Sequence, residues 1–136
     1  MTLQHNALVT GNSSGLGLGL SHALLDRGHQ VYGCSRRGCE LEGVHDVQCD
    51  LADFDSVGPA LKQLLDGVKQ LDLVILNAGI LGEIKPMHET SLDELQRIMD
   101  INVWSNKVVL DWLLEADIKV GQIVAISSGA AVLGNK

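Results

Sequence analysis

The sequence predicts an α/β fold, namely a doubly wound parallel β-sheet with helices on both faces. Short apolar runs alternate with helical patterns from one end of the 136 residues to the other, as they do in β-α-β proteins. Two of these runs, at 7–10 and 71–76, lack an alternating polar face, which is typical of central strands covered on both sides. A glycine-rich turn joins the first apolar run to the first helical pattern.

The first half of the chain supplies three strands and one helix. Residues 7–10 form a short buried strand, and the spacing of the apolar residues at 16, 20, 23 and 24 predicts a helix over 16–27, which Gly28 ends. The second and third strands are expected at 30–34 and 44–49, and the link between them is too short for a full helix.

The second half supplies two strands and two helices. Helical spacing predicts a helix over 54–68, and the continuous apolar run over 71–76 predicts the fourth strand. Ser91 and Glu94 have the spacing of a capping box, which begins a third helix. A turn at Gly121 precedes the fifth strand, at 122–127. The resulting order, β-α-β-β-α-β-α-β, describes a single domain over 1–136.

The composition restricts the class of protein. With 46% hydrophobic residues, the chain is long enough for one core but not for two. Lys and Arg total 10 against 17 Asp and Glu, and the net charge of −7 argues against general binding to nucleic acid or to anionic membranes. No apolar run reaches the roughly 18–20 residues that span a bilayer, and the polar residues 1–6 do not resemble a secretory signal.

The cysteines and histidines form no metal-binding pattern. Cys34, Cys39 and Cys49 are odd in number and contain no Cys-x-x-Cys pair, which suits a reduced, cytoplasmic protein better than a disulfide scaffold or a zinc site. Five histidines lack ligand spacing together with acids or thiols, so we expect no metal site: His5, His22, His29, His45 and His88.

The segment 101–114 is apolar all round. Nine of its fourteen residues are apolar, and at 100° per residue they point in every direction rather than along one stripe. One side can face the sheet, and the other side needs a partner. Either the rest of the chain covers it, or it forms a subunit interface.

The turn at 10–17 has the features of a dinucleotide phosphate site. Glycines at 11, 15 and 17 allow a positive φ and a close approach of phosphate to the main chain, at the point where a strand leads into a helix. The spacing is G-x-x-x-G-x-G, which differs from the G-x-G-x-x-G of other dinucleotide folds. It is not a P-loop, because no Lys-Ser or Lys-Thr follows the glycines.

At these residues the chain resembles the short-chain dehydrogenase/reductase family, whose cofactor signature is the Thr-Gly-x-x-x-Gly-x-Gly found at 10–17. Four further segments match the family in the right order, with Leu76 replacing the first Asn of its Asn-Asn-Ala-Gly motif. They are Asp50-Leu51, Asn77-Ala78-Gly79, Asn102 and Ser127-Ser128. The resemblance implies a Rossmann-type sheet of strand order 3-2-1-4-5 from which the family's C-terminal strands are missing.

The resemblance also implies roles for these residues. Six of them cradle the pyrophosphate region: Gly11, Ser13, Ser14, Gly15, Leu16 and Gly17. Asp50 and Leu51 flank adenine, and Asn77, Ala78 and Gly79 line the ribose side. Two catalytic positions are retained: Ser128, which holds the substrate oxygen, and Asn102, which helps to organise a water and the catalytic Lys.

The second strand ends in a pair of arginines. NAD sites place an acid there to accept from the ribose 2′-OH, but here no acid precedes Glu40. Guanidinium matches a phosphate bidentately, so we predict NADP(H) over NAD(H), with Arg36 as the main contact and Ser35 or Arg37 assisting. The alternative is a solvated arginine pair in a surface turn. A basic residue that often precedes the second glycine of the family's motif is replaced by Ser14.

The family's acid/base motif, Tyr-x-x-x-Lys, is absent from the 136 residues. It lies about a dozen residues beyond the catalytic Ser in the family, whereas Ser128 is followed by eight residues, and the single tyrosine, Tyr32, has no Lys four positions on. The chain is therefore expected to be a fragment of a longer polypeptide, a truncated product or a non-catalytic NADP(H)-binding protein. Alone, it should bind cofactor weakly and reduce nothing.

The resemblance thus implies an NADP(H)-dependent oxidoreductase that acts on a small-molecule carbonyl or secondary alcohol. The alternative is a non-catalytic NADP(H)-binding module that acts through a partner. An epimerase or dehydratase of the extended type usually has G-x-x-G-x-x-G, which this chain lacks. The family commonly dimerises through the helices that match 92–117, so we expect a homodimer or homotetramer with Trp104 and Val108 near the interface. Residues 80–90 border the substrate pocket in this interpretation but identify no substrate.

Overall fold

The computed structural model describes residues 4–80 and 85–126. Its five strands form one parallel sheet in the order β3-β2-β1-β4-β5, as the family resemblance implied. The strands are β1 (Asn6–Thr10), β2 (Gln30–Ser35), β3 (His45–Gln48), β4 (Gln70–Leu76) and β5 (Lys119–Ala125).

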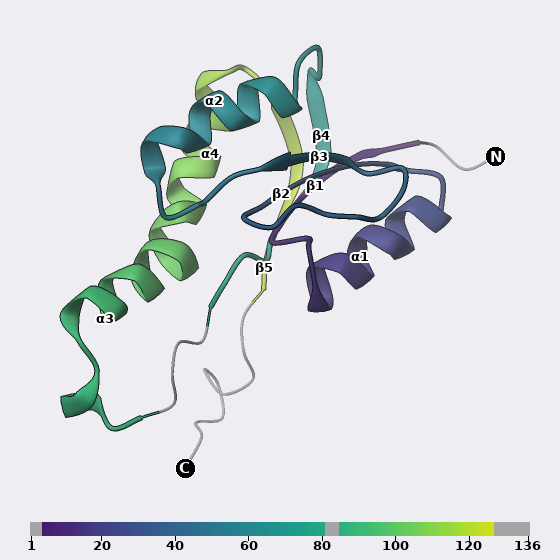
Figure 1. Ribbon diagram of the computed structural model, residues 1–136. Coiled ribbons are helices and arrows are strands. Elements are labelled where there is room, and N and C mark those ends of the chain that lie inside the picture. Colours follow the sequence, from purple (N-terminus) through teal and green to yellow (C-terminus); the bar gives the residue numbers. More distant parts are fainter. Residues whose placement is uncertain (1–3, 81–84, 127–136) are drawn as a thin grey trace.

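Helices cover both faces of this sheet (Figure 1). Helix α1 (Gly15–Asp26) lies on one face, and α2 (Phe54–Leu64) and α4 (Ser105–Glu115) lie on the other. Helix α3 (Leu92–Met99) and a π-helical turn, η2 (Asp100–Trp104), lead into α4 without a break. A short 3-10 turn, η1 (Met87–Glu89), precedes α3. No helix in the described ranges is long and apolar enough to cross a membrane.

The central strands are buried on both faces because helices cover both. On β1, Leu8 faces the cluster formed with α2 and α4, whereas its neighbour Val9 faces the cluster formed with α1. Both side chains are fully buried. Their burial explains why the sequence of β1 shows no polar alternation.

Most of the predicted ends of helices and strands differ from the observed ones by at most one residue. The end of α2 and the start of β5 differ by more. Helix α2 ends at Leu64 rather than at 68, and the chain then turns through Gly67, whose φ is +79°. Strand β5 begins at Lys119 and includes Gly121, which was expected to form a turn. A Cβ at Gly121 would lie 2.8 Å from the Asp72 carbonyl oxygen, so this glycine permits close contact between strands. The predicted end at Ser127 lies outside the described residues.

The start of α3 is as predicted. The Ser91 hydroxyl oxygen accepts the Glu94 N–H at 3.1 Å, which satisfies one of the free amides of the first turn. The Glu94 carboxylate lies 3.1 Å from Nζ of Lys85, which extends the contact to the segment before η1.

The apolar segment 101–114 has one buried stripe. Its buried residues are four apart: Ile101, Ser105, Val109 and Leu113. Val108 is half-buried against the same core. Trp104 is 47% exposed and Leu114 is 68% exposed, so the described part of the chain covers one side of this helix and leaves apolar side chains on the other.

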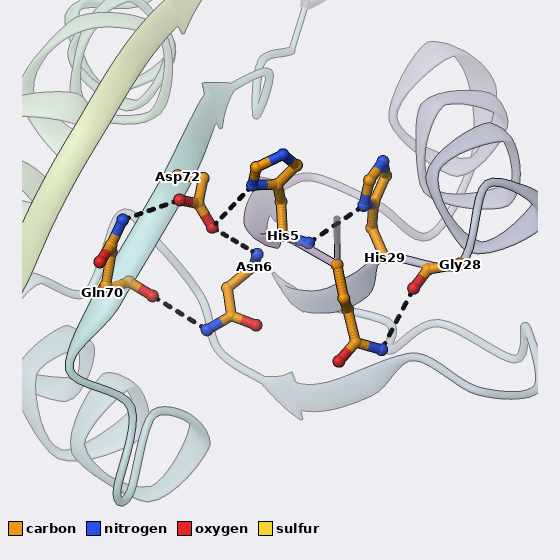
Figure 2. A network of polar contacts seen from close by, with 7 residues as sticks. His5, Asn6, Gly28, His29, Gln70 and Asp72 are labelled. Atoms are coloured by element: carbon orange, nitrogen blue, oxygen red, sulfur yellow. Dashed lines mark hydrogen bonds and ion pairs between the residues drawn. The ribbon is translucent and has the colours of Figure 1, made fainter. Parts of the chain in front are cut away.

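A polar network joins β1 to β4 at the amino ends of the strands (Figure 2). The Asn6 N–H and the Gln70 side-chain amide each donate to the Asp72 carboxylate at 2.8 Å. Nδ1 of His5 lies 3.5 Å from the same carboxylate, and His29 Nδ1 accepts the His5 N–H at 3.1 Å. The Asn6 amide, together with Gln70 and His5, lowers the pKa of Asp72 below its ordinary value.

The lowered pKa predicts how Asp72→Asn should behave with pH. A carboxylate whose pKa is lowered by folding stabilises the protein fully above its unfolded pKa of about 3.9, and this stabilisation is lost as pH falls through the folded pKa. The variant should therefore be less stable than the parent at pH 7, and the difference should be smaller at about pH 3. Urea unfolding at both pH values measures this, and a difference independent of pH would contradict it.

Candidate functional site

A cleft of about 430 Å³ lies where the strands end at their carboxyl termini. Its walls come from the turn after β1, the end of β2, the segment after β3, the segment after β4, and the α3–η2 helix. The crevice at the carboxyl ends of the strands is where open α/β sheets bind ligands. The volume falls within the range of small-molecule sites.

The turn after β1 is locked to the turn after β4. The Thr10 hydroxyl oxygen accepts the N–H groups of Asn77 and Ala78, both at 3.0 Å, and the Asn77 side-chain amide donates to the Gly11 carbonyl at 3.1 Å. Gly11 has φ +67°, and a Cβ there would lie 2.8 Å from Cα of Ala78. Glycine is thus required at 11 for both its φ and the space around it.

Gly17 brings the first turn of α1 against the loop. It is buried, and a Cβ there would lie 2.3 Å from the Gly11 carbonyl oxygen and 2.5 Å from Nδ2 of Asn77. The N-cap residue of α1 is Ser14, and its side chain makes no capping hydrogen bond within the described ranges. The first amides of α1 therefore remain available to an anion in the cleft, which Ser13 and Ser14 line.

Asn12 is a buried polar residue that sequence reasoning missed. Its side chain is fully buried, and neither amide atom has a hydrogen-bond partner among the residues that the structure describes. It lies against Gly33 of β2, where a Cβ would be 1.8 Å from Nδ2 of Asn12. Gly33 therefore makes the space that Asn12 occupies. Such unpaired buried groups are rare in folded proteins.

The cleft concentrates positive charge in an acidic protein. Three of the four arginines in the chain, Arg36, Arg37 and Arg97, line it, although the net charge of the chain is −7. Among the described residues of the lining, the one acidic residue is Asp50. Clustered guanidinium groups attract anions and pair well with phosphate.

The end of β2 presents these arginines on a fixed turn. Ser35 is buried, and its hydroxyl oxygen accepts the Gly38 N–H at 3.0 Å. Arg36 and Arg37 lie between these two residues and are exposed. The hydrogen bond holds the backbone of the turn while both guanidinium groups stay accessible to a ligand.

Asp50 does not cap α2, whose N-cap residue is Asp53. Instead, its Oδ1 accepts the Ala52 N–H at 3.0 Å, and its Oδ2 lies 3.6 Å from Nη1 of Arg97. The neighbouring Leu51 is buried and lines the cleft. No local sequence pattern marked Arg97 as a site residue, because it reaches the cleft from α3.

Asn102 clamps the segment after β4. It lies on the π-helical turn, and its side chain accepts the Ile80 N–H at 2.7 Å and donates to the Ile80 carbonyl at 2.8 Å. π-Helical turns are frequent at functional sites because they redirect side chains. Asn102 thus orders the backbone of this wall without lining the cleft. Ser127 and Ser128 lie outside the described residues.

The cysteines near the cleft are thiols at neutral pH. Burial raises the pKa of Cys34 to about 12, and burial also raises the pKa of Cys49, which lines the cleft. Neither has the lowered pKa of a reactive nucleophile. Among the described residues, no group of three or more His, Cys, Asp or Glu side chains could hold a metal ion.

Most of the predicted site residues come together in this cleft. Those that line it are Gly11, Ser13, Ser14, Ser35, Arg36, Arg37, Asp50, Leu51, Asn77, Ala78 and Gly79. Gly15 lines a neighbouring hollow that shares Ser13 and Arg37 with the cleft. Gly17 lies beneath the turn, and the Leu16 side chain is 54% exposed outside the lining.

The short chain dehydrogenase family model matches residues 5–136. A 2-dehydro-3-deoxy-L-rhamnonate dehydrogenase (NAD(+)) of a Sphingomonas species is 31% identical over 95% of the chain and 55% of its own length. A probable NADP-dependent dehydrogenase of Haemophilus influenzae is 29% identical over 90% of the chain and 52% of its own length.

A solved structure also shares the fold. The crystal structure of a short chain dehydrogenase family protein from Francisella tularensis matches with a TM-score of 0.82 and 28% identity, over 98% of this chain and 55% of that one. The chain therefore spans about half the length of the proteins that it matches.

Proposed function

Because the chain belongs to the short chain dehydrogenase family, we propose that it forms the cofactor-binding part of an oxidoreductase that prefers NADP(H). The substrate would be a small-molecule carbonyl or secondary alcohol. The observation that carries this proposal is the arginine-lined cleft beside a glycine turn with free helix amides.

The described residues fit such a cofactor. The absence of a Cβ at Gly11 lets the turn after β4 pack closely against the main chain, and the amides of α1 would hold the pyrophosphate, with Ser13 and Ser14 beside it. Arg36 would pair with the 2′-phosphate, and Arg37 or Ser35 would assist.

The other walls fit the rest of the nucleotide. Asp50 and Leu51 would flank adenine, and the residues that would line the ribose side are Asn77, Ala78 and Gly79. When bound, the nicotinamide group supplies or accepts the hydride. Ser128 would hold the substrate oxygen, and Asn102 would keep the wall after β4 in place through Ile80. The acid/base pair that the family uses is absent from these 136 residues, so we propose that they bind nucleotide without turning over substrate.

Calorimetric titration with NADPH and, separately, with NADH tests the cofactor preference. The two relatives carry different cofactors in their names, so the preference rests on the arginines at the end of β2. We expect NADPH to bind at least about tenfold more tightly, the effect of one added charge-assisted contact. Equal or tighter binding of NADH would overturn the preference, and binding of neither would overturn the proposed function.

We also propose that the protein is a homodimer or homotetramer that associates through the helices at 92–117. The exposed apolar side chains there include Leu92, Val103, Trp104 and Leu114. Exposed apolar surface of this kind is typical of interfaces.

Trp104→Glu should therefore lower the fraction of protein in the oligomer, because it puts a charge among the apolar side chains of the proposed interface. Analytical size-exclusion chromatography or ultracentrifugation measures the change. Gln63→Glu, which adds the same charge at an exposed position on α2, is the matched control and should behave like the parent. An unchanged assembly in Trp104→Glu would argue against this interface.

A further inference from the structure

Arg97 connects two walls of the cleft that are far apart in the sequence. It comes from α3, whereas Asp50 follows β3, and Nη1 of Arg97 lies 3.6 Å from Oδ2 of Asp50. Both side chains line the cleft. The ion pair therefore crosses the end of the cleft that the proposed function assigns to adenine.

The two oxygens of the Asp50 carboxylate have different neighbours. Oδ1 accepts the Ala52 N–H at 3.0 Å, so it is committed to its own loop. Oδ2 remains for a ligand, and Arg97 is the cation beside it. The orientation of the free oxygen thus depends on a residue from the opposite wall.

The pair is too exposed to serve mainly the stability of the fold. The side chains of Arg97 and Asp50 are 40% and 38% exposed, and exposed ion pairs contribute little to folding. Removing the Arg97 charge should therefore leave the protein folded. A loss of function in such a variant would then report on the ligand.

We propose that Arg97 is a positioning residue that aims Oδ2 of Asp50 at the exocyclic amine of adenine, and so makes the site selective for that base. This inference rests on the proposed function. An amine donates to a carboxylate, whereas a carbonyl oxygen in its place would face the carboxylate as a second acceptor. Loss of the cation frees the carboxylate to rotate away from the base.

The test compares NADPH with its hypoxanthine analogue, in which a carbonyl oxygen replaces the adenine amine. Calorimetric titration of the parent should give about tenfold tighter binding of NADPH, the effect of one charge-assisted hydrogen bond. In Arg97→Gln this ratio should fall at least about threefold, because the carboxylate is no longer aimed. Arg97→Lys keeps the cation and should retain most of the ratio.

A matched control removes a different cation. Lys107 pairs with Asp111 on α4 and is not among the described residues that line the cleft. Lys107→Gln should therefore keep the parent's ratio of affinities for NADPH and its hypoxanthine analogue. A merely destabilised variant would bind both nucleotides more weakly at an unchanged ratio. An unchanged ratio in Arg97→Gln, or equal binding of both nucleotides by the parent, overturns the inference. A parent that binds neither nucleotide overturns the proposed function itself.

Discussion

Gly17→Ala should destroy nucleotide binding and destabilise the protein. The new methyl group would lie 2.5 Å from Nδ2 of Asn77 and 2.3 Å from the Gly11 carbonyl oxygen, a backbone contact that no side-chain rotation relieves. Either α1 moves away from the turn or the hydrogen bond from Asn77 to Gly11 breaks. Both changes displace the amides that would hold the pyrophosphate. Overpacking of this kind costs about 1–3 kcal/mol.

Urea unfolding and NADPH titration measure the two effects of Gly17→Ala separately. Gly19→Ala is a matched control two residues along the same helix, since nothing lies within 4 Å of a Cβ there. It should stabilise the protein by up to about 1 kcal/mol through helix propensity and leave NADPH affinity unchanged. Parent-like NADPH binding by Gly17→Ala would show that the turn tolerates a side chain at this position.

Arg36→Glu should reverse the cofactor preference. The substitution removes a guanidinium that would pair with the 2′-phosphate and places a carboxylate where it would repel that group. We expect NADPH affinity to fall by roughly 10- to 100-fold, since a hydrogen bond to a charged group is worth about 1.5–3 kcal/mol. NADH affinity should hold or rise, because a carboxylate can accept from the free 2′-OH.

The natural control is the fourth arginine of the chain. Arg27 is exposed at the end of α1, on the amino side of β2, and does not line the described cleft. Arg27→Glu makes the same change in net charge, so it separates a local contact from a general electrostatic effect. Equal losses of NADPH affinity in both variants would assign the effect to overall charge.

The layered architecture follows from local sequence patterns. Leu8 and Val9 are adjacent and both fully buried, and only a strand covered on two faces accommodates an unbroken apolar run in this way. The order of the strands was predicted from the resemblance, because no local pattern determines which strands pair.

Two errors in the predicted ends have a common cause. Gly121 was expected to break the chain, but it lies inside β5, where it allows contact with Asp72 of β4. A glycine needed for space and a glycine needed for a turn look alike in one sequence. Gly67, whose φ is +79°, does interrupt a helical pattern, since α2 ends at Leu64, four residues before the predicted limit of 68.

The residues of the candidate site also differ in whether a local sequence pattern identifies them. Asn77 and Asp50, which line the cleft, were predicted from the family resemblance, because short local motifs carry that resemblance. Arg97 was missed because its place in the cleft depends on how α3 lies against the segment after β3, which is a tertiary relationship. The π-helical position of Asn102 was also missed, since one added residue in a helical turn leaves no mark on a pattern that is apolar all round.

The contact between Asn12 and Gly33 restricts the order in which this protein can change. A methyl group on Gly33 would lie 1.8 Å from Nδ2 of Asn12, so a side chain at 33 requires a smaller residue at 12 first. Asn12→Ala opens a small cavity and removes an amide without a described partner, which a folded chain can tolerate. Alanine at both positions is therefore accessible when Asn12 is replaced first and Gly33 second. In the opposite order, the intermediate has the methyl group added at position 33 overlapping the Asn12 side chain.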